Sequence, residues 1–174
     1  MPYFFLNSSA TGLTDNVTPF WMCAASGAAV EVDTETGKVR VSRLINVVDC
    51  GRPINPKIVE TQISGAALMQ LGFTMFEKMH IDAGQVTNAS LADYKIPAIL
   101  DVPPMENETV DSYLSIGPFG AKGVGETATF CVSPAIANAI EDACGVRLTA
   151  LPLTPEAVFR ALRAQANNPL EDQE

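Results

Sequence analysis

A change from strand-like to helix-like patterning occurs within residues 38–76, KVRVSRLINVVDCGRPINPKIVETQISGAALMQLGFTMF. Residues 39–44 alternate apolar and polar side chains, which is typical of a half-buried strand, so we expect a strand over 38–48. The preceding residues 20–32 are also strand-like, and the sequence Asp-Thr-Glu-Thr-Gly at 33–37 has the composition of a tight turn. The sequence therefore predicts a long β-hairpin.

The second half of this stretch predicts a helix. Asn55 followed by Pro56 has the form of an N-cap with proline at the first helical position, so we expect a helix from Pro56 to about Phe76. Beyond its early turns this helix is apolar nearly all round, which predicts a central and buried position. Gln62 and Gln70 are exceptions inside it, and a buried amide without hydrogen-bond partners costs about 1–3 kcal/mol.

Shorter elements are expected downstream, bounded by Gly, Pro, Asn and Asp turn signals. They comprise a second hairpin turning at 82–85, an extended proline-rich stretch without helix at 94–104, strands at 109–115 and 147–151, and helices at 135–144 and 154–164. Hairpins with three helices, and no regular alternation of strands and helices, predict an α+β fold with a mixed or antiparallel sheet. We expect a single domain over 1–174, with an irregular leading segment at 1–19 and a frayed acidic tail at 166–174.

The charge balance excludes one class of partner. Eleven Lys and Arg residues face 20 Asp and Glu residues, for a net charge of −9, whereas nucleic-acid surfaces depend on clustered basic side chains. No Lys or Arg precedes Lys38, so the basic start of a secretory signal is missing and we expect a cytoplasmic protein. No run approaches the roughly 18 apolar residues of a spanning helix. We expect neither a nucleic-acid partner nor a membrane span.

The cysteines do not form a recognisable metal motif. Cys23, Cys50, Cys131 and Cys144 are widely separated, without a Cys-x-x-Cys pair, and His80 is the single histidine that could complete a zinc or iron–sulfur site. We interpret the four cysteines as reduced core thiols and His80 as an edge-strand residue. No protein ligand to a metal is therefore expected in this chain.

A glycine-rich loop at 117–126, GPFGAKGVGE, is the candidate for function. Its glycines would let the backbone approach a ligand closely, and Glu126 ends the loop in a position suited to acid–base chemistry. The alternative is a mobile surface turn whose glutamate lies near the positive end of a helix. Lys122 either adds charge for an anionic ligand or is an ordinary solvated lysine. The loop alone leaves both alternatives open.

Three motifs in fixed order favour a functional loop over a surface turn at 117–126. They are D-x-G-x-x-I-N-P at 49–56, Q-x-x-G-A-x-x-x-Q-x-G at 62–72 and G-A-K-G-V-G-E at 120–126, joined by Y-K-I-P at 94–97 and the segment 134–156. With them, residues 20–165 resemble the molybdenum-binding subunit of the xanthine dehydrogenase and aldehyde oxidoreductase family, which includes carbon monoxide dehydrogenase. The chain would be the C-terminal portion of that family's molybdopterin-binding domain.

The resemblance implies roles for particular residues. Glu126 would be the general base beside molybdenum, and Gln62 would contact the pterin cofactor rather than cap a loop carbonyl. The backbone of Gly123, Val124 and Gly125 would meet anionic oxygens of the cofactor or substrate. The aspartate and asparagine of the first motif are expected to organise the turn and cap the helix, outside the site.

The resemblance also implies a cofactor and partners. The cofactor would be molybdenum–molybdopterin, in its cytosine dinucleotide form, shared with a partner chain, and FAD and [2Fe–2S] clusters would lie on partner subunits. Family subunits are several times longer than this chain, so the expected partners are the remaining molybdenum-binding polypeptide, an iron–sulfur subunit and a flavin subunit. We expect the isolated chain to be inactive.

Two functions follow as hypotheses. In the first, the chain is a component of an oxidoreductase that hydroxylates an N-heterocycle or oxidises an aldehyde with oxygen from water, and passes the electrons to iron–sulfur and flavin centres. In the second, it is a scaffold or truncated domain of the same fold that binds no cofactor by itself. The motifs support the first hypothesis, and the short chain supports the second.

Overall fold

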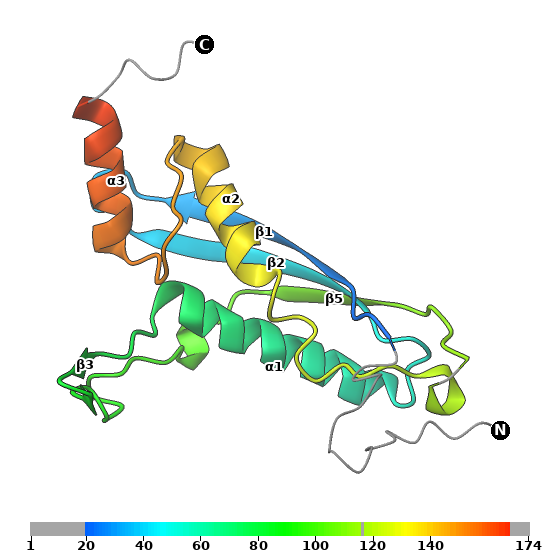
Figure 1. Cartoon of the computed structure of the whole chain (residues 1–174). Helices are drawn as coiled ribbons and strands as arrows, with labels where there is room; N and C mark the ends of the chain where they lie inside the picture. Colours follow the sequence, from blue (N-terminus) through cyan, green and yellow to red (C-terminus); the bar gives the residue numbers. More distant parts are fainter. Residues whose placement is uncertain (1–19, 116, 168–174) are drawn as a thin grey trace.

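The computed structural model of the chain describes residues 20–115 and 117–167. It confirms an α+β architecture, in which a three-stranded sheet packs against helices and a small hairpin extends to one side (Figure 1). The strands are β1 (Ala24–Val32), β2 (Val39–Asp49), β3 (Ile81–Asp82), β4 (Gln85–Val86) and β5 (Met105–Val110). The helices are α1 (Pro56–Met75), α2 (Val132–Cys144) and α3 (Pro155–Asn167), with 3₁₀ turns η1 (Ile99–Asp101) and η2 (Pro118–Gly120).

The long hairpin is confirmed. β1 and β2 are antiparallel, from Ala24 opposite Val48 to Val32 opposite Val39. The side chain of Asp33 holds the turn, because its carboxylate accepts hydrogen bonds from the next residues, including the Glu35 N–H at 2.9 Å. The first strand begins four residues later than predicted. The expected leading segment at 1–19 and most of the expected tail, 168–174, lie outside the described residues.

The sheet is mixed, because β5 adds to β2 in parallel, with order β1-β2-β5. The strand predicted at 109–115 is displaced: β5 ends at Val110. Beyond that point Ser112 leaves the sheet and donates its hydroxyl to Asp49 at 2.6 Å. The Leu114 N–H then bonds the Gly120 carbonyl instead of a strand. A local turn thus outcompetes the expected ladder.

Helix α1 matches its predicted bounds within one residue. Asn55 caps it, since its side-chain oxygen accepts from the Ile58 N–H at 3.2 Å, and proline occupies the first turn. Val59 and Ile63 on one face are buried against the sheet and α2. The prediction of a central and buried helix holds for this face only, because no described element covers the opposite face, where Phe73 is 42% exposed.

The two later helices are also confirmed. α2 begins at Val132, three residues before the predicted start, and ends at Cys144. Gly145 follows it, with a φ of 75° and an N–H bond to the Glu141 carbonyl that together form a glycine stop. α3 begins after Thr154, whose hydroxyl accepts from the Ala157 N–H at 3.2 Å. α2 lies across β1 and β2, and α1 lies below them in Figure 1.

The strand predicted at 147–151 is wrong. This stretch runs beside the helices, and the Leu153 N–H that follows it donates to the Thr74 carbonyl of α1 at 2.6 Å. Strand conformation needs a neighbouring sheet edge, and the described structure supplies none there. The second hairpin is confirmed as β3 paired with β4, and the proline-rich stretch is extended apart from the η1 turn.

All four cysteines are free thiols, but the core interpretation holds only for Cys50. Burial raises the pKa of the Cys50 thiol, whereas Cys23 is exposed and the other two are half-buried. His80 lies in the irregular segment just before β3 rather than in a strand, with its N–H bonded to the Asn88 side chain.

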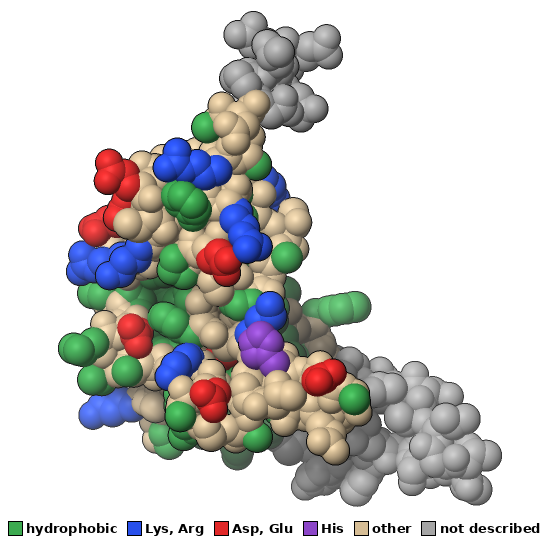
Figure 2. Space-filling model, turned by 90° about the vertical axis from the view of Figure 1, so that its left-hand side faces the viewer, with side chains coloured by type: hydrophobic (Ala, Val, Ile, Leu, Met, Phe, Trp, Pro, Cys, Tyr) green, Lys and Arg blue, Asp and Glu red, His purple; other side chains and the backbone are tan. Residues whose placement is uncertain are grey.

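The surface carries dispersed charge. On the face seen in Figure 2, basic and acidic side chains are interspersed with hydrophobic ones, without a continuous basic patch. Of the helices in the described part of the chain, none has the length and hydrophobicity of a membrane span.

Candidate functional site

The glycine loop is joined to the turn between β2 and α1. The Arg52 N–H donates to the Gly120 carbonyl at 2.9 Å, and Gly51 pairs with Ala121 as an isolated antiparallel bridge. The loop thus lies at the N-terminal end of α1, where η2 packs beside the turn (Figure 1). The first and third sequence motifs therefore meet in space.

Two glycines make this junction possible. Gly51 has a φ of 58°, and a Cβ atom there would lie 2.4 Å from the Gly120 carbonyl oxygen. Gly120 has a φ of 86°, and its Cβ would lie 2.5 Å from the Tyr113 ring. Phe119, which directly precedes Gly120, adopts a φ of 57° although it is not a glycine, and its side chain is 78% exposed. Such a conformation costs on the order of 1–3 kcal/mol and is typical of functional loops.

A buried ion pair locks the same junction. The Lys122 Nζ lies 2.6 Å from the Asp49 Oδ2, with side chains only 10% and 14% exposed. Asp49 also accepts from the Ser112 hydroxyl and from the Gly51 N–H. Lys122 is therefore neither a solvated lysine nor a cation available to an anionic ligand, because its ammonium group pairs with Asp49 inside the chain. Asp49 organises the turn, as expected, and Ser112 is a partner that the sequence did not reveal.

The protonation state of Asp49 follows from these contacts. Burial would raise the pKa of its carboxyl group, but the hydrogen bonds from Lys122, Ser112 and the Gly51 N–H outweigh burial and hold the pKa below its usual range. Asp49 is therefore ionised at neutral pH, and the lysine faces a full negative charge.

Glu126 ends the loop on an anchored backbone with an exposed side chain. Its carbonyl accepts from the Thr129 N–H at 3.0 Å and from the Thr129 hydroxyl at 2.8 Å. The next two residues, Thr127 and Ala128, are 0% and 1% exposed. No described residue bonds or pairs with the Glu126 carboxylate. The backbone position is thus anchored, and within the described residues the carboxylate has no partner.

The backbone before Glu126 is equally open. A Cβ atom on Gly125 would meet nothing within 4 Å, and one on Gly123 would meet only Phe20, at 3.9 Å. The N–H groups of 123–125 donate to no acceptor in the described part of the chain. The packing of the described residues therefore does not require these glycines, whereas a ligand that approaches the backbone would require them.

The two predicted glutamines have different environments. Gln70 is half-buried, and its amide donates to the Ser133 hydroxyl at 2.5 Å, so it has a hydrogen-bond partner of the kind that a buried amide needs. Gln62 is exposed on α1, and neither a loop carbonyl nor any other described group bonds its side chain. No described contact joins Gln62 to Glu126. The prediction of a buried Gln62 is wrong for this chain alone.

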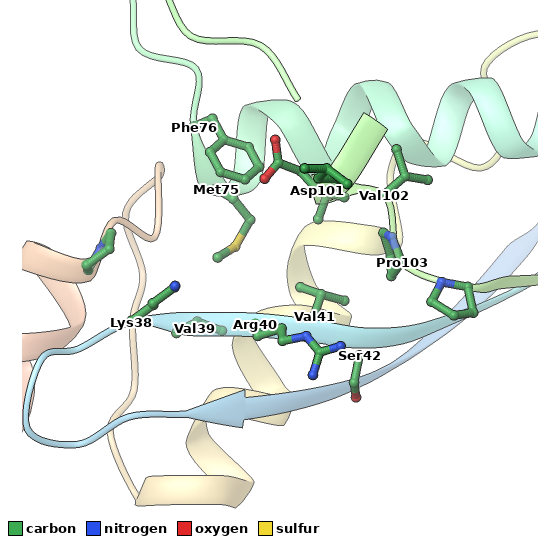
Figure 3. Close-up of a pocket in the computed structure, with 14 residues that line it drawn as sticks. Lys38, Val39, Arg40, Val41, Ser42, Met75, Phe76, Asp101, Val102 and Pro103 are labelled. Carbon is green, nitrogen blue, oxygen red and sulfur yellow. The ribbon is translucent and has the colours of Figure 1, made fainter. Parts of the chain in front are cut away.

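A cavity lies elsewhere, between the C-terminal end of α1 and the start of β2. It encloses about 490 Å³ and is lined by residues 38–42, 71, 75–76, 100–104 and 155. The side chain of Met75 extends from the helix toward β2, and Val39 and Val41 lie below it (Figure 3). None of the predicted site residues lines this cavity, so it belongs to the other end of the molecule.

The open groups suit an anionic cofactor. Free backbone N–H groups on glycines bind anionic oxygens, and an exposed amide such as that of Gln62 offers both a donor and an acceptor. The Glu126 carboxylate, which follows these glycines in the chain, is suited to proton transfer. The residues present thus fit the molybdopterin group that the motifs imply.

Comparisons with known proteins agree with these motifs. A family model described as a molybdopterin cofactor-binding domain matches residues 3–103. The probable hypoxanthine oxidase XdhD of Escherichia coli is 38% identical over 158 residues, which are 88% of this chain and 16% of that protein. The aldehyde oxidoreductase molybdenum-binding subunit PaoC of Escherichia coli is 39% identical over 136 residues, which are 76% of this chain and 19% of that protein.

Solved structures share the fold. Quinoline 2-oxidoreductase from Pseudomonas putida 86 superposes with a TM-score of 0.72 at 38% identity, covering 77% of this chain and 18% of that one. The aldehyde oxidoreductase of Desulfovibrio gigas has a TM-score of 0.75 at 33% identity, covering 82% of this chain and 15% of that one. The chain thus spans less than a fifth of the length of these relatives.

Proposed function

The chain belongs to the family of molybdenum-binding subunits of xanthine dehydrogenases and aldehyde oxidoreductases, and we propose that it forms the part of such an enzyme that carries the general base. One observation supports this above all: the Glu126 carboxylate is exposed and unpaired by any described residue, on a backbone anchored by Thr127 and Ala128. An anchored but free carboxylate is what proton transfer to a ligand requires.

The proposed reaction adds oxygen from water to the substrate. The attacked C–H group loses its hydrogen as one proton and two electrons. The attacking water gives up one proton and leaves its O–H group on the carbon. Glu126 takes the proton from water, which makes the oxygen a better nucleophile. The molybdenum cofactor, when bound, supplies the acceptor for the two electrons.

The proposed cofactor contacts come from two places in the fold. Gln62 presents its amide from α1, and the N–H groups of 123–125 point from the open half of the loop. We assign the cytosine dinucleotide form of molybdopterin, shared with a partner chain. Because the chain's own donors are few, most of the cofactor's polar groups would be bound by that partner.

The proposed substrate is a small N-heterocycle or an aldehyde. The names of the relatives refer to hypoxanthine, quinoline and aldehydes. Each of these compounds has a carbon atom that is bonded to a heteroatom and can accept oxygen. The proposed partners are the remaining molybdenum-binding polypeptide and the subunits that carry [2Fe–2S] clusters and FAD, in the cytoplasm. The isolated chain would be inactive, because less than a fifth of the relatives' length matches it.

The test is a Glu126→Gln substitution in the assembled enzyme, with Glu108→Gln as the matched control on an exposed residue of β5. We expect kcat with an aldehyde or N-heterocycle to fall by about 10²–10⁴-fold for Glu126→Gln only, at unchanged molybdenum content. Undiminished turnover would refute the assignment of Glu126 as the general base. Assembled protein that contains neither molybdenum nor activity would favour the cofactor-free scaffold.

A further inference from the structure

The outer face of α1 is apolar, and no element within residues 20–115 and 117–167 covers it. Ile58, Gln62, Gly65, Met69 and Phe73 follow one another at spacings of four, three, four and four residues, which places them on one side of the helix. Ile58, Met69 and Phe73 are 59%, 41% and 42% exposed, and Gln62 and Gly65 are exposed as well. We call these five residues the outer stripe.

The opposite face of α1 is already used. Val59, Ile63, Ala67 and Leu71 lie there and are buried in the core. The helix is therefore apolar on two sides, which is typical of a helix with neighbours on both. Within the described part of the chain only one side has them.

The outer stripe is shaped for close contact. It extends over 16 residues, and about 22 Å of helix axis separates the first from the last. At its centre, Gly65 has no described atom within 4 Å of an added Cβ, although glycine weakens a helix interior. A glycine there leaves room for another chain to approach the helix backbone.

We propose that the outer stripe docks the remainder of the molybdenum-binding subunit, the portion that relatives carry outside their match to this chain. This inference rests on the proposed function. The length of the relatives identifies the occupant: matches that cover 76–88% of this chain leave more than four fifths of each relative unmatched. An uncharged, apolar stripe on a chain of net charge −9 suits that constitutive neighbour better than a charge-steered transient partner.

Docking also explains the exposed Gln62. The partner would bury this amide among the apolar residues of the stripe, where it needs hydrogen-bond partners. The cofactor or the partner's backbone would supply them. The interface would therefore begin near η2, at the N-terminal end of α1, and continue along the helix (Figure 1).

The test uses a tagged chain co-expressed with the remaining molybdenum-binding polypeptide of its own organism. The variant combines Ile58→Ser, Met69→Ser and Phe73→Ser. The matched control changes three other exposed apolar residues, Ile81→Ser, Leu91→Ser and Leu100→Ser, which are 59%, 70% and 95% exposed. We expect the stripe variant to bind the partner about 100-fold more weakly or not at all, and the control to bind like the wild type.

Two further measurements decide the interpretation. Hydrogen exchange should show the backbone amides on the outer side of residues 58–73 of the wild-type chain protected only in the complex. The isolated stripe variant should unfold at the same temperature as the wild type. A destabilised stripe variant, unchanged binding, or no binding by the wild-type chain overturns the proposal. So does a homodimer that only the stripe variant disrupts, since the occupant would then be a second copy.

Glu126→Gln separates this proposal from the proposed function. It should leave binding to the partner intact while activity falls. Full activity in Glu126→Gln, together with lost binding in the stripe variant, would refute the base and keep the interface. Lost activity in Glu126→Gln with unchanged binding in the stripe variant would do the reverse.

Discussion

The two halves of the 117–126 loop differ in what holds them. Residues 117–122 are packed against the β2–α1 turn, with a buried Asp49–Lys122 pair and a glycine at 120 that no Cβ could replace without a clash. Residues 123–126 have open glycines and an exposed carboxylate. Glycines that look alike in the sequence thus have different roles. Those of the first half are required by packing within the chain, whereas those of the second half leave space that we assign to another molecule.

The largest expected effect on stability comes from a substitution in the first half of the loop. Lys122→Met would leave the Asp49 carboxylate buried without its cation, so we expect a loss of about 3–5 kcal/mol in the free energy of unfolding, measured in urea. Lys57→Met, on an exposed residue of α1, is the control and should change little. A loss below about 1 kcal/mol would show that the pair behaves like a surface contact and that the two halves are alike.

A smaller effect contrasts the two sets of glycines. Gly120→Ala forces a side chain onto a backbone with a φ of 86° and toward the Tyr113 ring, so we expect a loss of about 1–3 kcal/mol. Gly125→Ala meets no described atom and should change stability by less than about 0.5 kcal/mol. Thermal unfolding of both variants measures the difference. Equal losses would contradict the contrast.

The pH dependence tests the same pair more finely. Because the folded state lowers the pKa of Asp49, its contribution to stability is complete above the unfolded pKa and is lost as the pH falls through the folded pKa. The stability gap between the wild type and Asp49→Asn should therefore be constant from about pH 7 to 5 and shrink below about pH 4. Urea unfolding across this range measures it, and a gap that grows toward acid would refute the assignment.

The smallest expected effect on stability belongs to the second half. Glu126→Gln should unfold within about 0.5 kcal/mol of the wild type, since no described residue bonds its carboxylate. Gly125→Ala should behave similarly but lower the molybdenum content of the assembled enzyme, because its methyl group occupies the space open to the cofactor. A destabilised Glu126→Gln protein would show that the carboxylate has a structural partner within the chain.

Local signals in the sequence predicted most elements. The Asn55-Pro56 pair gave the start of α1, and the alternation before it gave β2. The strands expected at 109–115 and 147–151 failed, because strand conformation depends on a sheet edge that the sequence pattern does not reveal. Ser112 illustrates this failure, since its bond to Asp49 takes it out of the sheet.

The sequence by itself determined the family, the order of the motifs and the two capped helix starts, because these depend on residue types at short spacings. Tertiary structure alone decided that Lys122 pairs with Asp49, that Gln70 bonds Ser133 and that Gln62 lies on a face of α1 that no described element covers. The reason is physical: hydrogen-bond partners and burial are set by residues distant in the chain, and a polar side chain carries no local sign of which partner it will meet.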